Sequence, residues 1–335
     1  MFWLLSHRSP SLVIYYDFIP ISTLLVIALL FFVPLSHKRL SISTHGRYRF
    51  LSTLKRVSTG YIAQTADGKF GDILLADVLT SYAKVIADLF VALCMFFKPA
   101  GSATARPDRS CGGEVVVPLI IAIPYLIRFR QCVIEYLRVK RSNRRSGGLG
   151  SSGWGGQHLA NATKYASAFP VIILSALQRS MTHNHASIGL SEAGIYRAWI
   201  LAVFINSTYS FYWDVQKDWD LTLLSRSRER TSPEHAYGLR KILVFPQNSL
   251  YYGAIGLDLL LRFTWSLKLS THLDHFNDWE GGIFVLEAAE VFRRWIWIFF
   301  RVETEWVRNL SGGSPGQDDI LLGEWAGRGR DIDDD

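Results

Sequence analysis

Cysteine, charge and internal repeats are all scarce in this chain of 335 residues. It holds three cysteines, an odd number, and two of them lie in apolar runs, which excludes a secreted domain held together by disulfides. Charged residues make up 19% of the chain and hydrophobic residues 49%, a balance too apolar for a disordered chain and unusually apolar for a soluble globule. The chain shows no heptad run and no separate soluble domain. A soluble enzyme is therefore disfavoured.

Long uncharged runs are present instead, and the first covers residues 18–35. At about 1.5 Å per residue, such a helix approaches the hydrocarbon thickness of a bilayer. No small-residue cleavage pattern follows it, so we interpret it as a retained anchor rather than a signal peptide. Six further segments are long and apolar enough to cross: 73–97, 112–131, 159–179, 193–213, 247–270 and 281–300. Pro118 and Pro124 favour a broken helix in the segment 112–131.

Basic residues alternate between the connecting loops. Loops 36–72, 132–158 and 214–246 are rich in Lys and Arg, whereas 180–192 and 271–280 contain neither. Because basic loops stay in the cytosol, this alternation predicts seven crossings, with a lumenal N-terminus and a cytosolic C-terminus. Lys98, Arg106 and Arg109 blur the pattern in the one remaining loop.

The fold class that we expect is an all-α polytopic membrane protein, a bundle of about seven transmembrane helices with a polar, charge-lined interior. Residues 1–70 hold the first transmembrane helix and a basic cytosolic loop. Residues 71–310 form the main transmembrane domain, with a flexible Gly/Ser linker at 146–156. The acidic tail, 311–335, has the composition of a disordered segment.

Ionisable side chains inside the apolar segments are the most informative feature, because each costs about 2.5–3.5 kcal/mol unless it is paired or hydrated. They recur at helical spacing, so that carboxylates, cations and a hydroxyl share helix faces. The clearest are Asp77, Ser81, Lys84, Asp88, Asp258, Arg262, Glu287, Glu290, Arg293, Arg294 and Arg301. Any one of them could form an internal ion pair or snorkel to the interface. Together they favour a water-filled path, and the arginines favour an inorganic oxyanion bound by their planar forks.

Spacing also predicts how two groups of these residues are arranged. Glu290 lies three and four residues before Arg293 and Arg294, so we expect it to pair with one arginine and leave the other for the anion. Asp258 and Trp265 lie one turn to either side of Arg262, where they can orient its guanidinium.

Several strings resemble the EXS family of eukaryotic phosphate exporters. They are FYWDVQKDWD at 211–220, LRFTW at 261–265, EVFRRWIWIFF at 290–300 and RVETE at 301–305. Shorter matches at 71–77, 128–132, 158–165 and 244–247, together with Asp88, extend the resemblance over about residues 70 to 310. The length and the segment FGDILLADVLTSYAKV at 70–85 are similar to the short fungal Golgi branch, the ER-retention-defective proteins, which lack the SPX domain of longer members.

The resemblance implies transport of inorganic phosphate from the Golgi lumen to the cytosol. This recycles phosphate released by glycosylation and supports retention of resident ER and Golgi proteins. It implies a multi-pass Golgi protein with no enzymatic activity and no cofactor. Family positions along the phosphate path fall on Asp77, Arg128, Lys164, Tyr165, Asp214, Asp218, Arg262, Trp265, Glu290, Arg293 and Arg294. We add Asp258, Thr80, which replaces an asparagine of the plasma-membrane exporters, and Lys84, which is particular to this branch.

Two other functions remain open at this stage. One is a Golgi sorting or scaffold protein that retains glycosyltransferases through its basic loops and tail, with the buried charges playing a structural part. The other, much weaker, is a membrane-embedded transferase that uses lumenal His and Asp side chains: His183, His185, His272, Asp274, His275 and Asp278. Their spacing matches no zinc signature, so we expect no metal.

Expected partners follow from the same features. They are inorganic phosphate, membrane lipids and Golgi sorting machinery bound through the loops or tail. The basic loops suit a cytosolic face or anionic headgroups and do not indicate nucleic acid. The aromatic clusters at 211–213 and 295–300 are typical of interfacial belts and helix packing.

Overall fold

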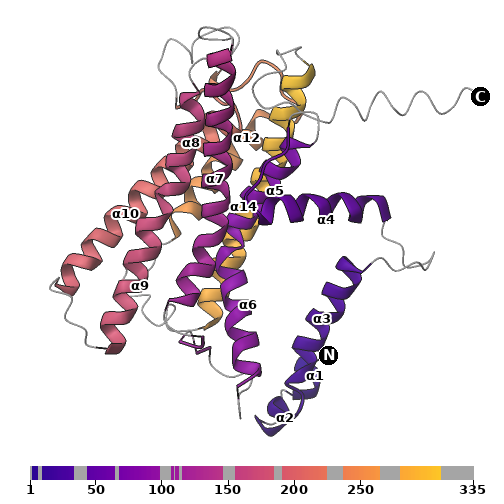
Figure 1. Ribbon diagram of the computed structural model, residues 1–335, viewed down its shortest axis with the longest axis vertical. Helices are drawn as coiled ribbons and strands as arrows, with labels where there is room; N and C mark the ends of the chain where they lie inside the picture. Colours follow the sequence, from indigo (N-terminus) through magenta and orange to yellow (C-terminus); the bar gives the residue numbers. More distant parts are fainter. Residues whose placement is uncertain are drawn as a thin grey trace, which may run out of the picture.

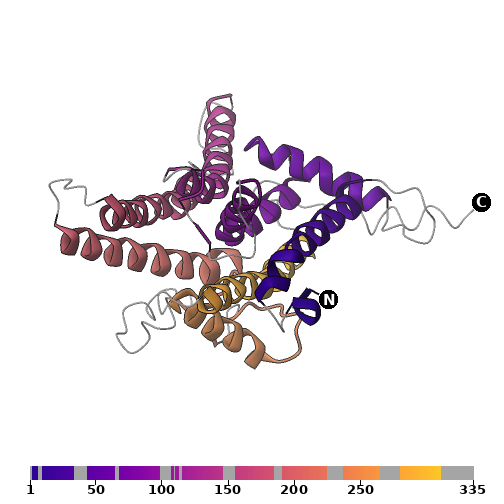
Figure 2. The same ribbon diagram turned by 90° about the horizontal axis from the view of Figure 1, so that it is seen from below.

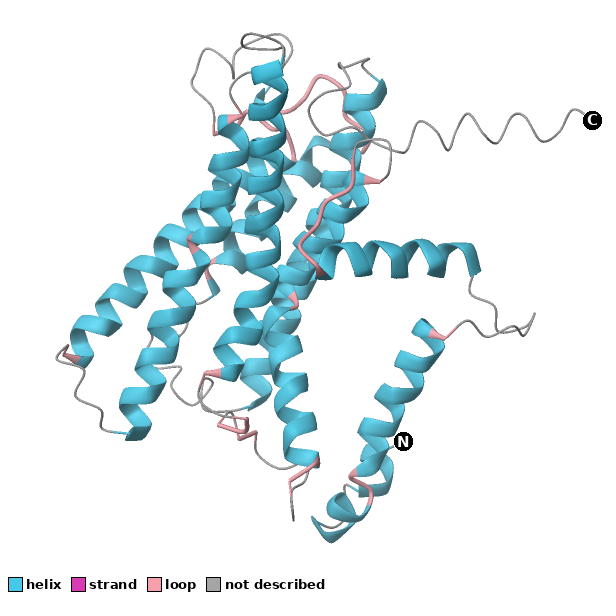
Figure 3. Cartoon of the chain, in the orientation of Figure 1, coloured by secondary structure: helices cyan, strands magenta, loops and turns pink. Residues whose placement is uncertain are grey.

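The computed structural model describes residues 2–6, 10–33, 44–64, 68–98, 107–108, 110–112, 115–145, 155–184, 191–224, 237–264 and 280–310. These residues form helices and connecting loops, and no strand occurs among them (Figure 3). The all-α prediction is therefore confirmed. Trp265, the loop 271–279, most of the linker 146–156 and the tail 311–335 lie outside the described residues.

The N-terminal part forms four helices beside the main bundle (Figure 1). They are α1 (Phe2–Ser6), α2 (Pro10–Tyr15), α3 (Phe18–Phe32) and α4 (Thr44–Ser58). Most of the large apolar side chains of α3 are exposed, including Leu25, Val26 and Ile27. An uncharged helix with this surface suits lipid rather than water. Helix α4, in contrast, is basic and lies across the direction of the bundle helices (Figures 1 and 2).

The bundle itself brings together the remaining helices. They are α5 (Lys69–Ser81), α6 (Ala83–Phe96), α7 (Val116–Arg145), α8 (Gly156–Ala166), α9 (Ala168–Asn184), α10 (Glu192–Trp213), the π-helix η2 (Asp214–Asp218), α12 (Asn248–Arg262) and α14 (Glu280–Leu310). Helix α7 packs against α6 and α8, α9 packs against α10, and α12 against α14. Gly155, with a φ of +80°, lets the chain enter α8 close to α7, since a Cβ there would meet Tyr136 at 3.2 Å.

The positions of the helix breaks differ from the prediction. Helix α7 continues past Pro124, whereas the expected second span bends by 60° between α5 and α6, at Tyr82. Pro118 lies in the first turn of α7, where backbone N–H groups have no hydrogen-bond partner within the helix, so its missing N–H costs nothing there. Pro124 removes only one backbone hydrogen bond of the helix. Near Tyr82, the Thr80 hydroxyl donates to the backbone carbonyl oxygen of Asp77 at 2.7 Å. A side-chain bond of this kind competes with the backbone hydrogen bonds of the helix and often bends it.

Membrane-crossing capacity is clear for part of the chain. Two helical stretches among the described residues, Ser11–Leu30 and Val116–Arg144, are long and apolar enough to cross, and the bent pair α5–α6 can supply a third crossing. A membrane protein is thus supported, while the count of seven spans stays a prediction. Polar side chains interrupt the other helices and lower their mean hydropathy.

One disulfide, which the sequence did not predict, joins the end of α6 to the segment before α7. Cys94 and Cys111 are bonded, with Cα atoms 6.1 Å apart, and Cys132 is a buried free thiol. Around the disulfide, Val91, Met95 and Val117 form a small apolar core. The bond therefore fixes the far end of the bent helix against α7.

The largest apolar core lies where η2, α12 and α14 meet. Its central side chains are Trp219, Tyr251 and Trp297, each at most 1% exposed. Trp295 and Phe299 point outward from the same helix and are about half exposed. The aromatic cluster at 295–300 therefore divides between helix packing and an outer surface suited to lipid.

Candidate anion site

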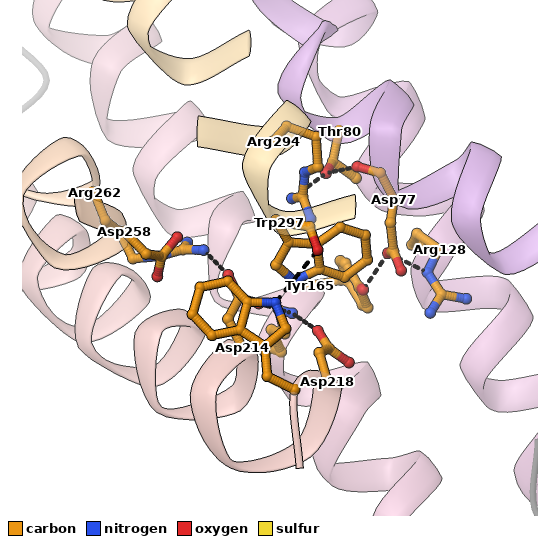
Figure 4. A network of polar contacts seen from close by, with 12 residues as sticks. Asp77, Thr80, Arg128, Tyr165, Asp214, Asp218, Asp258, Arg262, Arg294 and Trp297 are labelled. Carbon is orange, nitrogen blue, oxygen red and sulfur yellow. Dashed lines mark hydrogen bonds and ion pairs between the residues drawn. The ribbon is translucent and has the colours of Figure 1, made fainter. Parts of the chain in front are cut away.

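A charged network occupies the middle of the bundle, where α5, α7, α8, η2, α12 and α14 converge (Figure 4). It contains five basic and five acidic side chains: Arg128, Lys164, Arg262, Arg293, Arg294, Asp77, Asp214, Asp218, Asp258 and Glu290. Most of them are buried, and Asp214 is fully so. Thr80 and Tyr165 complete the set that the sequence predicted, with Lys84 nearby and Trp265 outside the described residues.

The first part of this network joins α5, α7 and α8. The Nε atom of Arg128 donates to Asp77 Oδ1 at 2.7 Å, and the Tyr165 hydroxyl donates to the same oxygen. The Arg128 guanidinium also lies 5.0 Å from the centre of the Tyr165 ring. On its other side, Arg128 Nη1 donates to Gln131 Oε1 at 3.0 Å. A buried guanidinium held on three sides keeps a fixed direction, as recognition of an oxyanion requires.

Asp214 is the centre of the second part. Its carboxylate accepts from Lys164 Nζ at 2.9 Å, from Arg262 Nη2, and from Arg293 Nη1 at 3.4 Å. The π-helix η2 places Asp214 and Asp218 next to each other, and Lys164 also contacts Asp218, at 3.3 Å. Short π-helical turns are frequent at functional sites, because they shift side chains out of regular helical register.

Glu290 pairs with Arg293 and not with Arg294. Arg293 donates through Nε and Nη2 to the Glu290 carboxylate at 2.9 and 2.6 Å, and through Nη1 to Asp258 at 2.8 Å. The expectation that Glu290 pairs with only one of the two arginines is confirmed. Asp258 also accepts from Arg262, at 3.5 Å, so the predicted contact between them exists but is longer than the contact with Arg293.

Among the arginines of this network, Arg294 is the one with a buried nitrogen that has no hydrogen-bond partner. Its Nε atom donates to Ser81 Oγ at 2.8 Å and its Nη2 atom to Thr80 Oγ1 at 3.4 Å. Its guanidinium lies 4.5 Å from the centre of the Trp297 ring. The Nη1 atom is buried and has no hydrogen-bond partner. Since a buried N–H without an acceptor is costly, an anion beside this atom would supply the missing acceptor.

The network as a whole is electrically balanced when every carboxylate is ionised. Arg128, Lys164, Arg262 and Arg293 each contact a carboxylate, and the fifth cation, Arg294, contacts hydroxyl groups. This pairing reduces the cost of holding so much charge between apolar helices. An added anion must therefore displace a carboxylate, arrive with a proton, or use the spare donor of Arg294.

Lys84 lies apart from this network. It is on α6, beyond the bend at Tyr82, and its Nζ atom contacts Asp88 at 2.8 Å and Glu287 of α14. Its side chain is 43% exposed. The sequence placed Asp77 and Lys84 on one continuous helix face, and the bend separates them.

The predicted phosphate path omits four contacting residues, Ser81, Gln131, Glu287 and Trp297, although the sequence pattern had already indicated Ser81 and Glu287 as polar side chains on the same helix faces. Spacing could have indicated three of them, since Ser81 lies four residues after Asp77, and Gln131 and Trp297 lie three after Arg128 and Arg294. Among the described residues, no group of three His, Cys, Asp or Glu side chains could hold a metal ion. The side chains of the candidate lumenal His and Asp residues lie outside that part of the chain.

Comparisons with known proteins give the family context. The family model of the EXS family matches residues 1–307. Protein ERD1 homolog 1 of Schizosaccharomyces pombe is 34% identical over 246 residues, which cover 73% of this chain and 59% of that relative. Protein ERD1 of Kluyveromyces lactis is 33% identical over 254 residues, covering 72% and 60%.

A human relative is similar over a comparable stretch. Solute carrier family 53 member 1 is 31% identical over 279 residues, which cover 79% of this chain and 36% of the human protein. The chain thus spans about 60% of the length of the two fungal relatives and about a third of the human one.

Proposed function

The chain belongs to the EXS family, as its motifs indicate, and from this membership and the buried arginines we propose that it transports inorganic phosphate across the Golgi membrane, from lumen to cytosol. In this role it recycles phosphate released by glycosylation and supports retention of resident ER and Golgi proteins. The relatives named ERD1 and the human solute carrier support a function related to phosphate export.

The observation that carries the proposal is the spare Nη1 donor of Arg294, buried within an otherwise paired network. The hydroxyls of Ser81 and Thr80 hold two other nitrogens of the same guanidinium, and the Trp297 ring fixes its plane. A tetrahedral oxyanion offers several acceptor oxygens and can take the spare donor first. This arrangement favours phosphate over a neutral solute.

The rest of the network supplies weaker sites along the path. Asp214 takes the place between Lys164, Arg262 and Arg293 that an oxyanion would take. When Asp214 exchanges with phosphate, the three cations change partner without entering lipid unpaired. Exchange of this kind keeps each binding step weak enough for release.

The two ends of the bundle differ chemically in two ways, and these differences support an orientation of the protein in the membrane. The disulfide end holds the end of α9 and the start of α10 as well (Figure 1), and disulfides persist in oxidising compartments such as the secretory lumen. The opposite end holds Lys140, Arg141 and Arg144 of α7, typical of a cytosolic face. Lys98, which blurred the sequence pattern, is paired with Asp108 at 3.1 Å. We therefore assign the disulfide end to the lumen and the end of α14 to the cytosol.

Asp108 belongs to the exposed loop at the lumenal end. Hydrogen bonds from Ser110 and then from Lys98 lower the pKa of its carboxyl group to about 2. The Asp108 carboxyl group therefore stays ionised at any pH found in the secretory pathway, and it offsets the basic charge of this loop.

The decisive experiment is flux of radiolabelled phosphate into vesicles that contain only the purified protein. Arg294→Lys keeps the charge but loses the planar fork, and we expect flux to fall about 10- to 100-fold, the range of one charge-assisted hydrogen bond of about 1.5–3 kcal/mol. The matched control, Arg308→Lys, changes an arginine of the same helix whose side chain is 38% exposed, and it should leave flux unchanged. Normal flux in the Arg294→Lys protein would remove this residue from the path.

A sorting protein without transport is the second candidate, favoured by the exposed basic end of α7. Retention of a Golgi glycosyltransferase in cells separates the two functions. If transport underlies retention, the Arg294→Lys protein at normal abundance should lose both phosphate flux and retention. Full retention without flux would instead favour the sorting protein.

A further inference from the structure

A second buried arginine, Arg240, lies outside the central network, in the segment between η2 and α12. It is 6% exposed, and its Nη2 atom donates to Glu303 Oε2 at 2.7 Å. Glu303 is near the end of α14, at the same end of the bundle as the end of α7 (Figure 1). The Nε and Nη1 atoms of Arg240 are buried and have no hydrogen-bond partner. Among the described residues, no other arginine has two such nitrogens.

The carboxylate of Glu303 does not satisfy these two nitrogens, because both of its oxygens already have partners. Its Oε2 atom accepts from Arg240, and its Oε1 atom accepts from the Tyr251 hydroxyl and from the backbone N–H of Val244 at 2.8 Å. Guanidinium N–H groups that are buried without an acceptor are costly. Arg240 therefore keeps the capacity to bind a further acceptor group.

Another polar group without a partner lies in the neighbouring segment. Thr222 is 9% exposed, and its Oγ1 atom is buried with no hydrogen-bond partner. Its backbone N–H donates to the carbonyl oxygen of Gly238 at 3.0 Å, so this segment runs beside the one that carries Arg240. A Cβ on Gly238 would lie 2.9 Å from Leu223 Cα, which shows how closely the two segments pack. The hydroxyl and the guanidinium thus come from two adjacent segments at one end of the bundle.

The backbone on both sides of this place adopts an uncommon conformation. Asp220, with a φ of +53°, and Tyr237, with a φ of +60°, are the only non-glycine residues with positive φ in the described part of the chain. Asp220 precedes Thr222 by two residues, and Tyr237 precedes Arg240 by three. Strained conformations of this kind persist only where the surrounding structure fixes them, and they cluster at ligand-binding sites.

The packing places Arg240 between a rigid core and the surface. Leu221 and Leu239, which flank the two polar residues in sequence, are at most 1% exposed and belong to the largest apolar core. Ile242 and Val244, which follow Arg240, are about half exposed. Arg240 therefore lies just beneath an exposed segment, within reach of a small solute from the water.

We propose that Arg240 and Thr222 form a second oxyanion site at this end of the bundle, and that its occupant is inorganic phosphate. Phosphate offers several acceptor oxygens for the guanidinium nitrogens, and one of them can also pair with the threonine hydroxyl. The exposed side chain of Lys241 adds positive charge at this edge, which favours an anion over a neutral ligand. The choice of phosphate rests on the proposed transport, whereas the binding of an oxyanion does not.

Binding can be followed at this place in the full-length protein, in nanodiscs that expose both faces. A trifluoromethyl label on Ile242→Cys lies two residues from Arg240. The native cysteines stay unlabelled, since Cys94 and Cys111 are bonded to each other and Cys132 is buried. We expect the fluorine NMR signal to move and saturate with inorganic phosphate, and not with chloride at the same ionic strength. The absence of a saturable movement with phosphate would overturn the proposal.

Two substitutions and a matched control test the ligands. Arg240→Lys keeps a cation beside Glu303 but removes the two nitrogens without partners, and the Kd for phosphate should rise about 10- to 100-fold. Thr222→Val should raise it about 2- to 10-fold. The control, Arg308→Lys, makes the same change in a 38% exposed arginine that lies 3.8 Å from Asp220, and it should keep the wild-type Kd. An unchanged Kd in either site variant, or an equal rise in the control, would overturn this pair of ligands.

Thermal unfolding without phosphate separates a ligand site from a structural contact. The Arg240→Lys protein should melt at the temperature of the wild type, because the nitrogens that it loses make no hydrogen bond within the chain. A clearly lower melting temperature would show that these nitrogens have a structural partner, and it would overturn the proposal.

Two further arms identify the occupant and separate this site from the central network. Phosphatidic acid in the nanodisc, without inorganic phosphate, should leave the signal in its free position; movement to the bound position would assign the site to a lipid headgroup instead. Arg294→Lys should lower phosphate flux and keep the Kd measured at the Ile242→Cys label. Loss of binding at this label in the Arg294→Lys protein would show that the label reports the central network, and it would overturn a second site. Binding at the label in a protein without flux would refute transport and leave this site standing.

Discussion

Arg293 and Arg294 are adjacent in sequence, yet their contacts predict opposite consequences of the same substitution. Replacing Arg293 by Met removes the principal partner of Asp258, which is 3% exposed and keeps only a 3.5 Å contact with Arg262. Breaking a buried ion pair on one side costs about 3–5 kcal/mol, because the remaining charge has no adequate partner. At roughly 2–4 °C per kcal/mol, the melting temperature should fall by roughly 6–20 °C.

Replacing Arg294 by Met removes hydrogen bonds to two hydroxyls rather than a short contact to a carboxylate. Ser81 retains its bond to Glu290 at 2.6 Å, and the spare Nη1 donor of Arg294 disappears with the side chain. The free energy of unfolding should fall by about 1–2 kcal/mol, which corresponds to a melting temperature lower by roughly 2–8 °C. Phosphate flux, in contrast, should be almost abolished. Arg294→Met should thus give a folded and inactive protein.

The assay is thermal unfolding of both variants in the same detergent, followed by flux measurements at matched amounts of folded protein. Charge exchange adds a second measurement. Combining Glu290→Arg with Arg293→Glu should recover part of the stability that is lost when Arg293 alone is replaced, since position 290 is about a third exposed and has room for an arginine side chain. Exchange of Glu290 with Arg294 should not. Equal melting temperatures for the two Met variants, or equal recovery by both exchanges, would refute the division between a structural and an anion-binding arginine.

Three further outcomes follow from the contacts. Cys94→Ser removes the disulfide between Cys94 and Cys111, which are 17 residues apart, and should lower the free energy of unfolding by about 3 kcal/mol. A reductant should lower the melting temperature of the wild type to that of the variant. Trp297→Ala should cost about 3–5 kcal/mol in unfolding measurements, whereas the half-exposed Trp295→Ala should cost far less. Arg262→Lys should reduce phosphate flux at least tenfold at equal protein abundance, because one ammonium group cannot reproduce both contacts of the guanidinium; near-normal flux would remove Arg262 from the site.

Contacts within one helix were the part of the site that the sequence could predict. Asp258 and Arg262, and Glu290 and Arg293, are three or four residues apart, so helical periodicity alone brings them together. The structure adds which partner is preferred. Arg293, not Arg262, makes the shorter bond to Asp258, because α14 presents it to α12 from across the bundle.

Contacts between helices were beyond prediction by spacing. Asp77 and Arg128 are 51 residues apart, and Lys164 and Asp214 are 50 apart, so their pairing depends on how α5, α7, α8 and η2 pack and at what depth. Periodicity gives the face of a helix but neither its neighbour nor its register along that neighbour. The family resemblance named these residues as a set, and their partners required the fold.

The helix breaks show the same limit in the backbone. The prolines of the sequence predict a break in the wrong helix, because α7 keeps its course through Pro124 while the bend occurs at Tyr82. The bend brings Thr80 and Ser81, the last two residues of α5, within hydrogen-bond distance of Arg294. The Thr80 hydroxyl, which bonds back to its own helix, is a weaker signal than proline, yet it lies at the candidate anion site.

In the proposed transport of phosphate, electrical balance explains how so many charges can remain inside an apolar bundle and still serve an anion. A network with excess positive charge would bind phosphate tightly and would be costly to keep in lipid without it. With carboxylates opposite four of its five cations, the resting network carries its own substitutes for the anion. Asp214 is the clearest, since it already accepts from Lys164, Arg262 and Arg293. Phosphate then competes with carboxylates of similar hydrogen-bonding geometry, so the free energy of each exchange is a small difference between similar interactions. Small differences are what passage requires, because an anion that is bound too tightly at any one site is not released.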